Sequence, residues 1–157
     1  MKNIKFLLIA VMSMILLSTH AQMLSKGVSK ELADHRKATI SNVVYDLTFD
    51  IPSDLNKRVT GKAFISFELN TLEDVILDFQ GGFDGTCYTF TGKKNKRRFA
   101  IATYQNEHII IPAKALQLGK NKVELDFVAL DKALNRNKDY MYTVFEPDMA
   151  RSAFPCF

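Results

Sequence analysis

The sequence predicts an all-β fold of antiparallel strands, packed as a sandwich or a curved saddle. Apolar residues alternate with polar ones at a period of two, and many of the apolar ones are β-branched or aromatic. The alternating segments are short, and glycine, asparagine and proline separate them. Strands this close together along the chain favour antiparallel sheets over a parallel sheet with crossover helices.

The strands can be placed in order along the chain. The clearest alternation covers residues 43–51 and ends in a turn at Pro52. The second covers residues 59–69, where only Phe64 breaks the apolar pattern. Further strands are expected at residues 75–79, 86–91, 99–103, 109–111 and 123–127, with 86–91 and 99–103 forming a hairpin. Brief helical stretches are expected only near residues 30–33, 113–116 and 131–134, and residues 131–141 form a polar excursion.

The first 21 residues have the layout of a secretory signal peptide. Lys2 and Lys5 precede an apolar run over residues 6–17, and small residues lead up to Ala21. The alternative is a membrane anchor, but this run falls well short of the ~20 residues that a spanning helix needs. We therefore expect cleavage after Ala21, export to the periplasm or the medium, and no stable membrane span afterwards. A polar lead-in at 22–36 and one β domain at 37–157 would remain.

Charge argues against a nucleic-acid partner. The whole chain carries +4, but the mature chain keeps 19 basic and 17 acidic residues, a net charge of +2. One basic cluster lies beside aromatic residues and could bind single-stranded nucleic acid. We favour a solvated hairpin tip whose charges discourage strand edges from pairing. The cluster consists of Lys93, Lys94, Lys96, Arg97 and Arg98.

No catalytic or metal-binding constellation is visible in the residues alone. After cleavage only His35 and His108 remain, without the close second ligand that zinc sites use. No serine lies in a nucleophile-elbow context, and Gly81-Gly82 closes a strand without opening a helix. Cys87 and Cys156 are interpreted as small buried side chains in preference to a disulfide, although export would permit one.

The last segment contains Tyr142 directly before Thr143, then Glu146, then Ala150-Arg151 and the run Phe-Pro-Cys-Phe at residues 154–157. It resembles the aminopeptidase N family of zinc metallopeptidases, in which a Y-x-T-Q-x-E segment is followed by A-R-x-x-F-P-C-F-D-x-P. Looser matches in the same order bring the resemblance to about residues 40–157. The F-P-C-F run is the specific part, and the D-x-P that would complete it is not in the sequence.

The resemblance implies a divided enzyme. Family members place an N-terminal β saddle over a thermolysin-like domain, which carries an H-E-x-x-H zinc site, a further glutamate ligand and a G-x-M-E-N loop. A zinc-bound water attacks the first peptide bond, with the H-E-x-x-H glutamate as general base. This sequence contains none of those residues. The expectation is therefore an N-terminal domain truncated before its catalytic partner, without zinc and inactive alone.

Glu146 is the one candidate substrate-binding residue. From its residue type alone it is a surface glutamate before a proline; the resemblance implies that it binds the free α-amine of a peptide. The family has glutamine two residues earlier, where this chain has Val144, which puts substrate positioning in doubt. The alternative function is a self-standing exported β-sandwich that binds a partner without catalysis.

Overall fold

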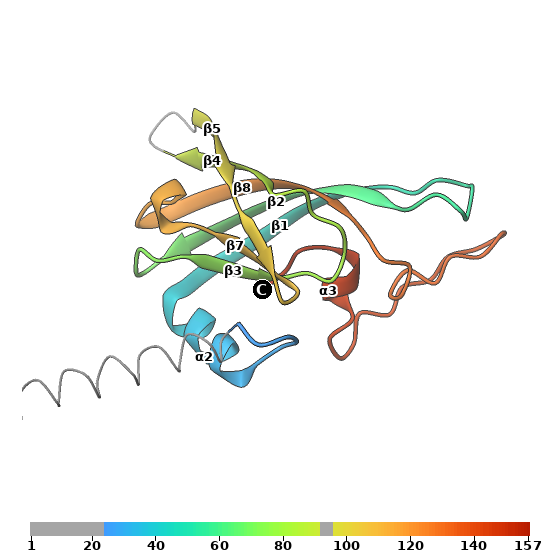
Figure 1. Cartoon of the computed structure of the whole chain (residues 1–157), viewed down its shortest axis with the longest axis horizontal. Helices are drawn as coiled ribbons and strands as arrows, with labels where there is room; N and C mark the ends of the chain where they lie inside the picture. The colour runs from blue at the N-terminus through green and yellow to red at the C-terminus, as the bar shows by residue number, and fades with distance from the viewer. Residues whose placement is uncertain (1–23, 92–95) are drawn as a thin grey trace, which may run out of the picture.

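The computed structural model describes residues 24–91 and 96–157, and it confirms the all-β prediction (Figure 1). Sheet A has the strand order β1-β2-β8-β4-β5 and sheet B the order β3-β7-β6, and every pairing is antiparallel. Sheet A consists of β1 (Ile40–Asp50), β2 (Thr60–Leu69), β8 (Gly119–Val128), β4 (Thr86–Thr91) and β5 (Lys96–Ile101). Sheet B consists of β3 (Val75–Asp78), β7 (His108–Ile111) and β6 (Thr103–Gln105). The predicted signal peptide, residues 1–21, lies outside the described residues.

The centre of sheet A is held in register by its alternating apolar face. Ala63 of β2 lies between Leu47 of β1 and Leu125 of β8. A bulge between Ser41 and Val44 shifts the start of β1, and the register is regular from there on. Because a slip of one residue would turn every apolar side chain outward, this face fixes the pairing.

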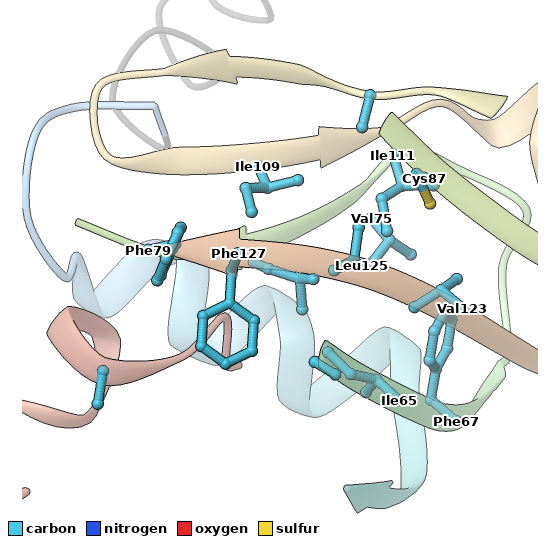
Figure 2. Close-up of a cluster of buried hydrophobic side chains, with 14 of the residues drawn as sticks. Ile65, Phe67, Val75, Phe79, Cys87, Ile109, Ile111, Val123, Leu125 and Phe127 are labelled. Carbon is cyan, nitrogen blue, oxygen red and sulfur yellow. The ribbon is translucent and has the colours of Figure 1, made fainter. Parts of the chain in front are cut away.

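The two sheets close on one hydrophobic core (Figure 2). Sheet A contributes residues such as Ile65 and Leu125, and sheet B contributes residues such as Leu77 and Ile109, all inaccessible to solvent. Phe127 sits at one end of the core, 5.8 Å from the ring of Phe79 and at a steep angle to it. Side chains from both sheets interdigitate here, which makes the fold a sandwich.

Helical structure is more extensive near the N-terminus than the sequence predicts. Helix α2 covers Lys30–Thr39, where only a single turn near residues 30–33 was expected. The Ser29 side chain caps it by accepting from the amide of Leu32, and Leu32 is buried. The cap and the two buried side chains, Leu32 and Arg36, support a helix that its weak amphipathic pattern does not predict. None of the helices in the described part of the chain is long and apolar enough to cross a membrane.

Two further expectations need correction. The strand expected at 99–103 is divided, because the chain leaves sheet A after Ile101 and begins β6 of sheet B at Thr103. The buried Ala102 between them donates to Gly85 O at 3.0 Å. Ala113–Ala115 forms the short 3-10 helix η1, as expected, whereas residues 131–134 form hydrogen-bonded turns and no helix.

Candidate functional site

The C-terminal segment is built into the body of the domain. Cys156 and Asp78 exchange backbone hydrogen bonds of 2.7 and 3.0 Å, which pairs the end of the chain with the end of β3. The backbone amide of Gln80 donates to Arg151 O at 2.7 Å. The short helix α3 (Ala150–Ala153) is therefore tied to the residues that follow β3.

The two phenylalanines of the F-P-C-F run have separate packing roles. Phe154 makes edge contacts with Tyr45 and Phe49 of β1, with ring centroids 6.2 and 6.4 Å apart. Phe157 packs against Phe67 at 5.7 Å, and its amide donates to the Tyr45 hydroxyl at 2.9 Å. These contacts give the F-P-C-F run a structural role beside β1.

Glu146 projects from the loop that leads into this anchored segment. Its side chain is exposed and forms no hydrogen bond or ion pair with any described residue. Its neighbour Phe145 is held by an edge contact with Phe154 at 5.7 Å, and the Val144 amide donates to Ala133 O at 3.0 Å. The Glu146 carboxylate is thus unpaired, on a loop whose preceding residues, Val144 and Phe145, are held in place.

The two charged residues that follow Glu146, Asp148 and Arg151, are in contrast paired with each other. The largely buried Arg151 donates to Glu107 Oε2 at 2.6 Å and to Asp148 Oδ2 at 3.0 Å. Gln80 and Lys26 complete the partners of Glu107, at 3.0 and 3.1 Å. Although burial opposes its charge, the hydrogen bonds from Gln80, Lys26 and Arg151 hold the pKa of Glu107 below its ordinary value.

A hollow of about 330 Å³ lies between helix α2 and the loop that carries Glu146. Phe145 and Pro147, the residues on either side of Glu146, both line it. On the other side it is lined by Val28 and Arg36. Glu146 itself does not line this cavity.

A second buried cluster joins helix α2 to both strands of sheet B that face it. Arg36 donates two hydrogen bonds to the Asp78 carboxylate, of 2.8 and 2.9 Å, and also donates to the carbonyl oxygen of Ile76. His108 Nδ1 lies 2.9 Å from Asp78 Oδ1, and Nε2 lies 3.0 Å from the carbonyl oxygen of Ser25. All these groups satisfy one another, so the cluster is structural.

The remaining candidate residues are dispersed. His35 pairs with Glu73 at 2.9 Å, apart from the buried His108. Across residues 24–91 and 96–157 no group of three or more His, Cys, Asp or Glu could hold a metal ion. Lys96, Arg97 and Arg98 lie on β5, whereas Lys93 and Lys94 fall outside the described residues. Both cysteines are free: Cys87 is buried and Cys156 half-buried.

Sequence reasoning missed the cluster of Arg36, Asp78 and His108. One signal was present: Asp78 and His108 are polar residues within or beside runs of apolar strand residues. A buried charge in such a run requires a partner. The partner Arg36 could not be found from the sequence, because it lies on a helix that the sequence did not predict at full length.

Comparison with known proteins adds no assignment. The chain matches no protein-family model, and no curated protein matches it.

Proposed function

We propose that this chain is the N-terminal, substrate-recognising domain of an exported zinc aminopeptidase. In this role Glu146 binds the free α-amine of a peptide, and a separate catalytic domain of the same polypeptide carries the zinc and cleaves the bond. The proposal rests on the resemblance of residues 142–157 to the aminopeptidase N family. Its structural support is that Glu146 is exposed and unpaired, whereas Asp148 and Arg151, which follow it, are paired.

The strength of the expected contact depends on how well it is shielded from water. A carboxylate and an ammonium 4 Å apart gain about 1 kcal/mol in bulk water and about 4 kcal/mol in a partly screened site. Glu146 is open to solvent in this domain. The domain alone is therefore expected to bind peptide N-termini weakly, and a covering domain would be needed to make the contact selective.

The surface around Glu146 suits such a covering domain. Five large side chains near it in the sequence are 40–63% exposed, namely Tyr140, Met141, Tyr142, Val144 and Phe145. Tyr140 and Tyr142 stack on each other with ring centroids 6.4 Å apart. Exposed apolar side chains that form one patch are typical of a surface that contacts another protein unit, which supports the proposal.

The first test is the coding sequence after codon 157. We expect an in-frame continuation that begins with D-x-P and later encodes H-E-x-x-H. A stop codon there would contradict the proposal and favour the self-standing binding module. Zinc analysis of the 157-residue protein adds a check. Stoichiometric zinc together with peptidase activity would contradict the expectation that this domain alone is inactive.

The second test concerns Glu146 in the enzyme that contains this domain. Glu146→Ala should raise KM for peptides with a free amine far more than for N-acetylated ones, because only the former carry the ammonium group. Glu31→Ala, which removes an exposed carboxylate on helix α2, is the matched control and should leave KM for both kinds of peptide unchanged. Equal effects of Glu146→Ala on both substrates would exclude the amine-binding role.

A further inference from the structure

Strand β5 forms an open edge of sheet A. It pairs with β4 on one side, and no strand of the described ranges pairs with its other side. The register of that pairing runs without a bulge from Thr86 opposite Ile101 to Thr91 opposite Lys96. An edge of this kind presents backbone donors and acceptors to a further strand.

The direction of those backbone groups follows from one hydrogen bond. Ala102 N donates to Gly85 O at 3.0 Å, in the same register as the β4–β5 ladder. Because hydrogen-bonded pairs alternate in an antiparallel ladder, Ala100 and Arg98 turn their backbone groups toward β4. The N–H and C=O groups of Arg97, Phe99 and Ile101 therefore point to the open edge.

A groove of about 640 Å³ lies beside this edge. Thr89 of β4 lines it, and so do Pro112 and Lys114, which lie between β7 and β8. Phe99 and Ile101 line it from β5 and are 62% and 67% exposed. A strand added to β5 could thus place alternate side chains against apolar surface.

The two charged side chains that line the groove, Arg98 and Lys114, are both cations. Arg98 and Lys114 line it, Lys96 lies two residues from Arg98, and none of the three has a charged or hydrogen-bonded partner within the described ranges. Arg97 differs, because it donates to Glu124 Oε2 at 2.8 Å and stacks over the Tyr88 ring at 3.4 Å. Three cations are therefore available to an occupant.

We propose that the β5 edge and its groove bind an extended, acidic segment of another protein by strand addition. The backbone of that segment pairs with Arg97, Phe99 and Ile101. Its carboxylates meet Lys96, Arg98 and Lys114, and its apolar side chains cover Phe99 and Ile101. This interaction is independent of the proposed peptidase role.

Other occupants fit the edge less well. A second copy of this chain would offer no carboxylate to Lys96, Arg98 and Lys114, because the six residues of its own β5 include three cations and no acid. The acidic strand β1 of this chain is already paired with β2. A single-stranded nucleic acid would match the charge but could not use the alternating backbone donors and acceptors. The cations therefore favour an acidic strand over a neutral or basic one.

Binding can be measured by fluorescence anisotropy with a fluorescein-labelled peptide of alternating glutamate and valine. We expect saturable binding that the double variant Arg98→Glu/Lys114→Glu weakens by roughly tenfold or more, because like charges then face each other. The control Lys132→Glu/Lys138→Glu reverses two exposed cations outside the groove and should bind normally. Failure of the acidic peptide to bind, or equal binding of its lysine counterpart, would overturn the proposal.

The strand geometry has its own test. The same peptide N-methylated at alternate residues, on the edge that faces β5, lacks the donors needed for pairing and should not bind. In the complex, amide exchange should slow at Arg97, Phe99 and Ile101. Undiminished binding of the methylated peptide would contradict strand addition. Tighter binding of an oligothymidylate would assign the surface to nucleic acid, and protection of these amides by self-association without peptide would assign it to a second copy.

Discussion

His108 and Asp78 are joined by a hydrogen bond of 2.9 Å between Nδ1 and Oδ1, and both side chains are buried. The other ring nitrogen of His108 faces the carbonyl oxygen of Ser25, which can only accept. Asp78 also accepts from Arg36 at both carboxylate oxygens and is therefore ionised. Both nitrogens of His108 can donate to these acceptors only in the imidazolium form, so the geometry favours the charged ring.

The protein should accordingly be most stable in mildly acidic solution. The hydrogen bond to Asp78 raises the pKa of His108 above its ordinary 6.5, although burial opposes this, so its contribution is complete below pH 6.5 and is lost as the pH rises through the folded-state value. Burial would raise the pKa of Asp78, but Arg36 and His108 hold it below 3.8, so its contribution is lost only in stronger acid. Urea unfolding should therefore require more denaturant at about pH 5.5 than at about pH 8.5.

Two histidine variants separate this effect from general charge effects. His108→Gln should lower stability at pH 5.5. It should also remove most of the loss of stability that the original protein shows between pH 5.5 and 8.5. His35→Gln alters the half-exposed pair with Glu73 and should leave that loss in place. If the stability of His108→Gln kept the pH dependence of the original protein, the charged His108 ring would not be the source of that dependence.

The same cluster shows how far sequence reasoning reached. Period-two alternation predicted β1, β2 and β8, because their inward residues share one core. The splitting of residues 99–103 between two sheets was not predictable, since it depends on where Ala102 meets Gly85 in space. Glu146 was singled out through the resemblance alone, and the structure adds that its carboxylate is free. Arg36 was missed because its role depends on contacts 40 and 42 residues away in sequence.

Removal of the guanidinium should be among the most damaging single changes. Arg36→Met leaves Asp78 buried without its main partner, which typically costs about 3–5 kcal/mol of unfolding free energy. The double variant Arg36→Met/Asp78→Asn should recover part of this loss, because no uncompensated carboxylate remains. Lys30→Met, which breaks an exposed pair with Asp34 on the same helix, is the control and should matter little. Equal losses for Arg36→Met and Lys30→Met in urea unfolding would contradict the buried-pair explanation.

A side chain at Gly61 should be destabilising, because β2 approaches its neighbours closely there. A Cβ at this position would lie 2.4 Å from Phe127 Cζ and 2.7 Å from the backbone oxygen of Thr48. Gly61→Ala should cost about 1–3 kcal/mol, since the ring and the strand must both move. At Gly82 a Cβ would meet its nearest atom, Val128 Cβ, at 3.2 Å, so Gly82→Ala should cost less. Thermal unfolding of the two variants tests this order, and a reversed order would contradict it.

Both thiols should be nearly unreactive in the folded protein. Burial raises the pKa of Cys87 and of Cys156 to about 12, so the nucleophilic thiolate is scarce at pH 8. Iodoacetamide should therefore modify neither cysteine in buffer and both in urea, as mass spectrometry of the intact protein can show. Modification of both in urea without a reductant also requires that no disulfide joins them. Rapid labelling of Cys156 alone in buffer would mean that the pairing of residue 156 with Asp78 opens readily, because that pairing is what holds the thiol against the body of the domain.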